Sequence, residues 1–264
     1  LGHGQPHDRR GHVHYDLGNS FYQLWLDPDM AYSCGYFREP DNTLAQAQQD
    51  KFDHLCRKLR LQPGMRLLDI GCGWGSLMGY AAERYGVECV GITVSREQTA
   101  WAKARYAGLP LEFRLQDYRS VNERFDRIAS VGMFEHVGHR NYRTYMEVAR
   151  RCLADDGLFL LHTIGKNERH TVTDPWIDKH IFPNGDLPAI GQIAEAAEGL
   201  FVVEDLHNFG ADYDTTLMAW HANFETAWPR FRDRLGDRFQ RTWCYYLLAC
   251  AGAFRARDMQ LWQW

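Results

Sequence analysis

A glycine-rich turn with an acid beside it is the first feature of the sequence that could do chemistry. The run LLDIGCGWG places Asp69 just before Gly71, Gly73 and Gly75. Glycines at the turn between a strand and a helix let the backbone pass close beneath a bound nucleotide. A carboxylate there would repel a diphosphate, but it suits a ligand that carries an ammonium group and no phosphate.

This combination points to S-adenosylmethionine, and the run resembles motif I of class I methyltransferases. Many such folds end the second strand with an acid that binds the ribose hydroxyls. This chain has GITVS instead, so we expect the neutral groups of Thr93 and Gln98 to bind the ribose. Gln116 and Asp117 end the third predicted strand, where class I enzymes commonly contact adenine. We expect Asp117 to accept a hydrogen bond from the adenine amino group, unless it only caps a turn.

The elements that must position these residues alternate along the chain. A helix with apolar positions at helical spacing begins at Thr43 and ends before Pro63-Gly64. The predicted strands cover 65–70, 87–93, 111–115, 125–131 and 157–164, and the predicted helices cover 76–85, 96–107 and 141–153. Ser95 and Gln98 form a predicted capping box at the second of these helices. The pattern predicts an α/β fold with a Rossmann-like doubly wound sheet.

The remaining segments are irregular or helical. Residues 1–42 form a predicted N-terminal segment folded over the cofactor site, and 43–264 form the predicted catalytic domain. Residues 165–188 hold three prolines and predict an insertion at the carboxyl end of the strands. A helix at 189–199, a strand at 201–207, and two helices at 214–235 and 242–253, within a helical region 214–253, should follow. The closing MQLWQW predicts the start of another strand, and we expect the natural chain to continue beyond it.

Composition excludes several classes of protein. The 264 residues carry 30 Lys and Arg against 34 Asp and Glu, a formal charge of −4, so nucleic acid is not an expected partner. Seven cysteines without a CxxC pair argue against a disulfide framework, and no metal site is expected. The chain lacks the roughly 18 uninterrupted apolar residues of a membrane-spanning helix, and the opening LGHGQPHDRRGH lacks the apolar core expected of a signal peptide. A cytoplasmic location is the expectation.

Several blocks together resemble the cyclopropane-fatty-acyl-phospholipid synthases and the mycolic acid cyclopropane synthases. The blocks are HYDLGNSFYQLWLDPDMAYSCGYF, LLDIGCGWG, GITVSREQ, SVGMFEHVG, LLHTIG, DPWIDKHIFPNG and NFGADYDTTLMAWHANF. The resemblance implies a class I methyltransferase fold with helical insertions that cover an acyl-chain site. It also implies transfer of a methylene unit from S-adenosylmethionine to the cis double bond of an unsaturated phospholipid acyl chain. The phospholipid enzymes carry a further N-terminal domain, so this chain would correspond to their catalytic domain or to a shorter relative.

The resemblance further implies that bound bicarbonate accepts the proton released during ring closure. The residues that match its ligands in the family are the Cys34 backbone, Glu135, His162, the Ile164 backbone and Tyr213. Tyr32 and Ser33 match residues that touch the methionine part of the donor. A histidine in a strand as apolar as LFLLHTI is usually a satisfied core residue, but its place at the end of a strand favours the site. We expect Glu135 to meet the bicarbonate O–H or a His162 N–H, because a buried carboxylate needs a partner.

The acyl chain should lie in an apolar slot. Aromatic residues that could line it, or could equally be core, are Tyr15, Phe134, Trp176, Phe182 and Tyr246. The stretch WPRFRDRLGDRFQRTW could contact anionic headgroups, although a solvated helix face is the commoner explanation of such a charge pattern. The expected partner is a phospholipid with unsaturated acyl chains at the inner membrane face, where the protein would be peripheral, and a homodimer is compatible with the sequence.

Two other functions remain open at this point. The first is methyltransfer that adds a methyl branch to a lipid or modifies another small molecule, normally with a side-chain base in a polar pocket. The second is a methyltransferase-like fold that only binds a cofactor or a lipid. The full set of Cys34, Glu135, His162 and Tyr213 argues against this second alternative.

Overall fold

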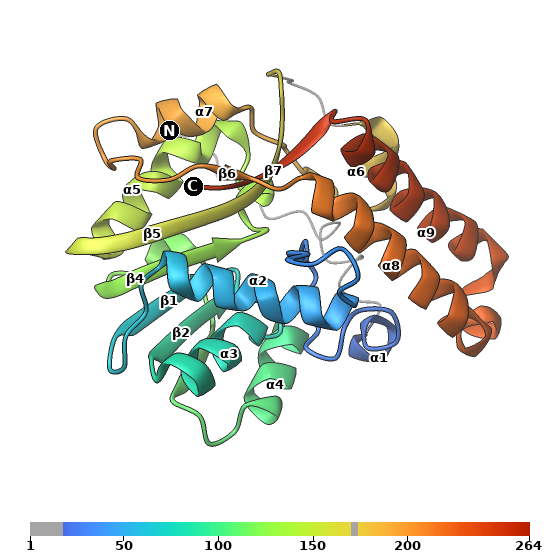
Figure 1. The fold of residues 1–264 in the computed structure, drawn as a ribbon, viewed down its shortest axis with the longest axis horizontal. Coiled ribbons are helices and arrows are strands. Elements are labelled where there is room, and N and C mark those ends of the chain that lie inside the picture. Colours follow the sequence, from blue (N-terminus) through green and yellow to red (C-terminus); the bar gives the residue numbers. More distant parts are fainter. Residues whose placement is uncertain (1–17, 170–173) are drawn as a thin grey trace, which may run out of the picture.

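The computed structural model describes residues 18–169 and 174–264. They form a central sheet with helices on both faces, and a pair of long helices projects to one side (Figure 1). The strands are β1 (Arg66–Ile70), β2 (Glu88–Thr93), β3 (Leu111–Leu115), β4 (Phe125–Val131), β5 (Leu153–Lys166), β6 (His207–Asn208) and β7 (Met259–Gln263). The α-helices are α1 (Asn19–Tyr22), α2 (Leu44–Lys58), α3 (Ser76–Tyr85), α4 (Arg96–Arg105), α5 (Tyr142–Cys152), α6 (Pro175–His180), α7 (Ile190–Ala197), α8 (Ala211–Ala227) and α9 (Arg232–Arg255).

The sheet has the strand order β3-β2-β1-β4-β5-β7-β6. The strands from β3 to β5 are parallel, and β7 is antiparallel to both β5 and β6. The chain order reverses between β1 and β4, because β1 pairs with β2 on one side and with β4 on the other. Ligands of open α/β sheets bind at this crevice, beyond the carboxyl ends of the strands. The predicted doubly wound fold is confirmed.

Apolar side chains hold a helical layer on each face of the sheet. One buried cluster joins α2 and α3 to the sheet through Leu55, Leu77 and Met78. A second cluster joins α5 and α7 to the opposite face through Tyr145 and Ile193. Strands buried on both faces must be apolar throughout, which is why the sequence shows continuous hydrophobic runs there.

A third cluster, rich in aromatic side chains, packs α1, α8 and α9 together. Its fully buried members include Phe21, Trp25, Trp220 and Trp243. Phe21 makes an edge-to-face contact with Trp243 at 5.1 Å between ring centres, an arrangement that aromatic pairs prefer. This aromatic core fixes the projecting helix pair over the carboxyl ends of the strands (Figure 1).

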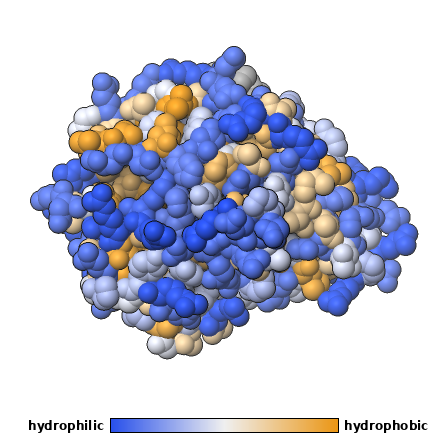
Figure 2. All heavy atoms as spheres, in the orientation of Figure 1, coloured by the Kyte–Doolittle hydropathy of each residue, from blue (hydrophilic) through white to orange (hydrophobic). Residues whose placement is uncertain are grey.

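One predicted strand differs from the structure. The strand expected at 201–207 is wrong for most of its length, because only His207 and Asn208 pair, with β7. The side chains of Val202 and Val203 are 82% and 55% exposed, and β7 takes the position beside β5. Figure 2 shows hydrophobic atoms gathered over the α7 region, on a face that is otherwise mostly hydrophilic. The run FVVEDLH is typical of a strand, but only its last residue, His207, pairs with β7.

The other differences are local. The predicted break between the last two helices is displaced, because α8 ends at Ala227 and a short 3-10 turn, Trp228–Arg230, precedes α9. Gly236 kinks α9 with a φ of 74°, which only glycine adopts readily. At α4 the capping box is only half formed: the Ser95 hydroxyl accepts from the Gln98 N–H, but the Gln98 side chain bonds Thr93 instead. The other predicted helices, and the strands at 65–70, 87–93, 111–115, 125–131 and 157–164, are confirmed within a few residues.

Candidate active site

The glycine loop between β1 and α3 is shaped to let a ligand approach its backbone. Gly71, Gly73 and Gly75 all have positive φ, at 86°, 53° and 85°. A Cβ on Gly75 would lie 2.6 Å from the ring of Phe113, and one on Gly71 would lie 2.8 Å from the Cβ of Met133. A Cβ on Gly73 would meet nothing within 4 Å. Two of the glycines are therefore required by protein packing, and Gly73 faces open space.

Asp69 lies in β1 beside this loop and is 2% exposed. Its Oδ1 atom is buried and has no hydrogen-bond partner among the described residues. Burial raises the pKa of this carboxyl to about 7, and the Lys51 ammonium opposes the shift. An acceptor oxygen buried without a partner is rare in a folded protein and suits a ligand donor such as an ammonium group.

The predicted ribose and adenine residues follow the second and third strands. The Thr93 hydroxyl donates to Gln98 Oε1 at 3.0 Å, so the structure brings these two residues together. Gln116 Nε2 donates to the Ser120 hydroxyl at 3.1 Å. Asp117 accepts from the Arg119 backbone N–H at 2.9 Å and forms a two-point ion pair with its guanidinium, so it does cap a turn. Its predicted contact with adenine stays a prediction.

The described part of the N-terminal segment lies against the glycine loop. The indole Nε1–H of Trp74 donates to Asn19 Oδ1 at 2.8 Å, which joins the loop to α1. The hydroxyl groups of Tyr32 and Tyr246 are 3.0 Å apart, which joins the segment to α9. Ser33 is buried, and its hydroxyl accepts a hydrogen bond from Lys51 Nζ at 2.7 Å.

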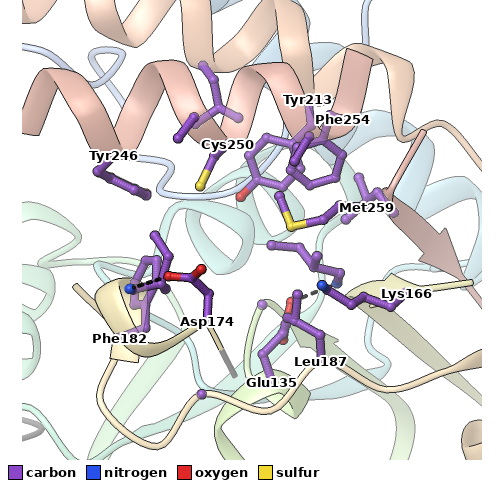
Figure 3. A pocket seen from close by; sticks show the side chains of 18 of the residues that line it. Glu135, Lys166, Asp174, Phe182, Leu187, Tyr213, Tyr246, Cys250, Phe254 and Met259 are labelled. Carbon is purple, nitrogen blue, oxygen red and sulfur yellow. Dashed lines mark hydrogen bonds between the residues drawn. The ribbon is translucent and has the colours of Figure 1, made fainter. Parts of the chain in front are cut away.

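A cavity of about 320 Å³ lies between the strand ends and helices α6, α8 and α9. Its apolar lining includes Ile177, Phe182, Leu217, Tyr246, Phe254 and Met259. Glu135 enters from the side of the sheet, whereas Tyr213 and Phe254 reach in from the two long helices, with the Tyr213 hydroxyl directed into the cavity (Figure 3). Tyr32 and Ser33 line the same space, which places the predicted donor site next to it. A largely apolar cavity with a few polar groups is typical of a small-molecule site.

Glu135 and His162 carry two unpaired polar atoms at the cavity. Glu135 lies in the 3-10 turn Phe134–His136 after β4, and its Oε1 accepts from the Ile164 backbone N–H at 2.7 Å. His162 Nδ1 accepts from Gln263 Nε2 at 3.2 Å, and no hydrogen bond joins His162 to Glu135. Glu135 Oε2 and His162 Nε2 are buried and have no partner among the described residues. With Nδ1 accepting, a neutral imidazole carries its proton on Nε2.

Burial sets the charge of both groups. It raises the pKa of the Glu135 carboxyl to about 7, against the opposing hydrogen bond from Ile164. It lowers the pKa of His162 well below the ordinary value, and the nearby Lys51 and Lys58 ammonium groups act in the same direction. His162 is therefore neutral at pH 7, so its ring can donate one hydrogen bond, from Nε2.

Tyr213 and Cys34 are both buried, but they occupy different positions relative to the cavity. The Tyr213 ring stacks on Phe254 with 4.5 Å between ring centres, and burial raises the pKa of its hydroxyl well above the ordinary value. Cys34 is fully buried in the N-terminal segment, and its Sγ bonds the Gly35 carbonyl oxygen at 3.1 Å. The predicted role of Cys34 rests on its backbone and stays a prediction.

The predicted acyl-slot aromatics divide between the cavity and the core. Phe182 and Tyr246 line the cavity. Trp176 packs edge-on against Tyr245, another lining residue, at 4.4 Å. Phe134 is fully buried and stacks on Tyr142 at 4.2 Å, so it belongs to the core. Tyr15 lies outside the described residues.

Two site residues escaped the sequence analysis. Lys51 is 1% exposed within α2, and Gln263 in β7 orients His162. A signal for Lys51 was present, because it lies four residues after Ala47 and four before Leu55 on the apolar face of a predicted helix. A lysine on such a face is rarely buried without a specific partner. Gln263 had no signal, since the pairing of β7 with β5 arises only in the fold.

One potential metal site lies away from the cavity lining. Ligand atoms of His221, Glu225 and Cys244, on α8 and α9, lie within 4.8 Å of one another. Two of the three already interact, because Cys244 Sγ donates to Glu225 Oε1 at 3.1 Å.

The strand order of the sheet and the glycine loop are those of a class I S-adenosylmethionine-dependent methyltransferase fold. The solved cyclopropane synthase MmaA2 from Mycobacterium tuberculosis matches it with a TM-score of 0.93 at 33% identity, over 99% of this chain and 98% of that one. The mycolic acid cyclopropane synthase CmaA1, solved in complex with SAH and CTAB, matches with a TM-score of 0.92 at 35% identity and the same coverage. The chain belongs to the mycolic acid cyclopropane synthetase family, whose model matches residues 3–264.

A curated relative extends this assignment. The cyclopropane-fatty-acyl-phospholipid synthase of Escherichia coli (strain K12) is 58% identical over 253 residues, which cover 96% of this chain. The match covers 66% of the length of that relative, so the chain spans just under two thirds of it.

Proposed function

We propose that this protein transfers a methylene unit from S-adenosylmethionine to the cis double bond of an unsaturated phospholipid acyl chain. The π electrons of the alkene attack the sulfonium methyl group, a second carbon bond then closes the ring, and one proton leaves. The products are a cyclopropane acyl chain, S-adenosylhomocysteine and a proton. This reaction needs a dry apolar slot and a proton acceptor, but no nucleophilic side chain.

The side chains of this site supply distinct functions. The apolar walls around Phe182 and Phe254 exclude water from the alkene and from the positive charge that develops on it. The aromatic faces of Tyr213 and Tyr246 can stabilise that charge through their quadrupoles. Asp69 and Gly73 are proposed to hold the methionine end and the adenosine of the donor at the rim.

The polar end of the cavity fits the bicarbonate that the family resemblance implies. When bound, bicarbonate supplies a base that takes up the proton lost in ring closure. Glu135 Oε2 would accept from the bicarbonate O–H, and His162 Nε2–H would donate to one of its oxygens. The Tyr213 hydroxyl lines the same space and adds a donor. These groups would orient the anion with its O–H directed at Glu135. One acceptor and two donors are complementary to the hydrogen-bonding groups of bicarbonate.

The observation that carries the proposal is a pair of buried atoms, Glu135 Oε2 and His162 Nε2, that have no partner among the described residues and belong to the lining of an apolar cavity shared with Tyr32 and Ser33. The test is mass spectrometry of phospholipid vesicles incubated with protein and S-adenosylmethionine. We expect a gain of one methylene mass on unsaturated chains, with loss of the olefinic proton signal. A product only on a soluble acceptor, or none with a competent cofactor supply, would contradict the proposal.

Simple methylation is the second candidate function, because the same donor site and apolar slot serve it. A methyl-branched lipid keeps the added mass but shows a branch methyl signal instead of cyclopropane protons. The nuclear magnetic resonance spectrum of the extracted lipid therefore separates the two products.

The lipid must reach the cavity from a bilayer. None of the helices in the described residues combines the length and the hydropathy of a transmembrane segment. We propose peripheral binding at the inner membrane face through α9, where Tyr245 is 57% and Leu248 is 42% exposed, with Tyr245 at the cavity. Arg238 and Arg241 on the same helix are also exposed, so both can attract anionic headgroups. Each such charge contributes about 1 kcal/mol to membrane binding. Sedimentation with anionic and neutral vesicles tests this binding, and analytical ultracentrifugation tests whether the protein forms a homodimer.

A further inference from the structure

Lys51 is a buried cation that the proposed reaction does not use. Its side chain is 1% exposed in the middle of α2, although removal of an ammonium group from water is energetically costly. Within the described part of the chain, no carboxylate oxygen lies within ion-pair distance of Nζ. Asp27, Asp29 and Asp69 act on it electrostatically, and burial lowers its pKa to about 8. An ammonium kept at this position needs a specific reason.

Its hydrogen bonds converge on one residue of the donor site. Lys51 Nζ donates to the Ser33 hydroxyl oxygen at 2.7 Å and to Gln48 Oε1 at 2.5 Å. Gln48 Nε2 in turn donates to the Ser33 carbonyl oxygen at 2.8 Å. Lys51 and Gln48 are three residues apart on one face of α2, so the helix holds Ser33 by both its side chain and its backbone.

This arrangement fixes the direction of the Ser33 hydroxyl bond. An ammonium group has only donors, so the Ser33 oxygen must accept from it. The proton of the serine is then directed elsewhere, and Ser33 lines the cavity next to Tyr32. The loop that carries Ser33 is shaped from its other end by Asp27, which accepts from the backbone N–H of Ala31 at 2.8 Å and of Asp29 at 3.0 Å.

We propose that Lys51 is a positioning residue that makes Ser33 a hydrogen-bond donor to the α-carboxylate of S-adenosylmethionine. The inference rests on the proposed function, because it assumes that donor. Asp69, with its unpaired oxygen, serves the ammonium group of the same amino acid, and Lys51 serves its carboxylate through Ser33. The site thus recognises the two charges of the methionine end with two buried groups of opposite sign.

The test compares two donors by calorimetry: S-adenosylmethionine and its decarboxylated analogue, which lacks only the carboxylate. Lys51→Met should weaken binding of S-adenosylmethionine by about tenfold or more, as expected for a charge-assisted hydrogen-bond chain, and should change binding of the analogue by less than about threefold. Ser33→Ala should give the same pattern, and the double variant should be no weaker than Lys51→Met alone, because the two residues act in series. Lys103→Met removes an exposed lysine of α4 and serves as the control.

Equal weakening of both donors by Lys51→Met would overturn the proposal, since that result means a general structural role. If Lys51→Met does not fold, Ser33→Ala decides: loss of discrimination between the two donors supports the proposal, and unchanged discrimination overturns it. Failure of the proposed function is distinguishable, because it appears as absent lipid product from wild-type protein that still binds S-adenosylmethionine and still discriminates against the analogue.

Discussion

The carboxylate of Glu135 accepts a hydrogen bond from the Ile164 backbone N–H at 2.7 Å, across the boundary between the turn after β4 and the end of β5. One oxygen of this buried acid is thereby fixed to the sheet, and the other has no partner within residues 18–169 and 174–264. The two oxygens of Glu135 therefore have different roles. The oxygen bonded to Ile164 orients the carboxylate, and the other oxygen can take part in the reaction.

Replacement of Glu135 by Gln should therefore preserve the fold and abolish most of the turnover. The Gln Oε1 can still accept from Ile164, but the amide presents N–H donors where the carboxylate presented an acceptor. We expect kcat to fall by about 10²-fold or more, in the range of a lost acid–base group, with little change in the affinity for S-adenosylmethionine. Lipid product analysis and calorimetry measure the two effects, and full turnover would remove Glu135 from the proposed anion site.

The same substitution should change the pH dependence of stability. The pKa of Glu135 is raised from 4.5 to about 7 in the folded protein, so the folded state binds the proton more tightly than the unfolded chain. Stability from this group is present below the unfolded pKa and is lost as the pH rises through 7. At pH 8 Glu135→Gln should be more stable than the wild type, by on the order of 3 kcal/mol, and at pH 4 the two should converge. Denaturant titrations at both pH values measure the difference, and a variant less stable at pH 8 would contradict it.

The glycine loop offers a matched pair of substitutions. Gly73→Ala and Gly75→Ala both place a Cβ at positive φ, at a cost of about 1 kcal/mol. Only the Cβ added at position 75 would collide with Phe113, at 2.6 Å, whereas the one added at position 73 would enter open space. We expect Gly75→Ala to lower the melting temperature strongly. Gly73→Ala should remain folded and bind S-adenosylmethionine weakly, as seen by calorimetry, and unchanged binding would show that the donor does not lie over Gly73.

Gln263 should control the protonation pattern of His162. Its amide donates to His162 Nδ1 at 3.2 Å and leaves the proton on Nε2, the buried nitrogen without a partner among the described residues. A carboxylate at this position can only accept, so Gln263→Glu should move the imidazole proton to Nδ1 or charge the ring. We expect kcat to fall by about tenfold or more with an unchanged KM for S-adenosylmethionine. Steady-state kinetics on vesicles measure both constants, and an unchanged kcat would show that the tautomer of His162 does not matter.

Much of the framework was determined by the sequence alone. The turn between β1 and α3 was predictable because glycines are needed for positive φ, and Asp69 was predictable as the acid beside it. The alternating apolar runs predicted the doubly wound sheet, since strands buried on both faces and amphipathic helices have different periods. The place of Glu135 and His162 at the strand ends followed from the same pattern, because parallel strands end at one edge.

Contacts between distant segments were decided only by the tertiary structure. The β7 strand pairs between β5 and β6, which brings Gln263 to His162 and leaves 201–206 without a partner strand. Lys51 reaches Ser33 only because α2 packs across the N-terminal segment. The partner of Glu135 was Ile164 and not His162. Such pairings depend on which of several compatible neighbours the chain brings within hydrogen-bond distance, and local periodicity does not contain that information.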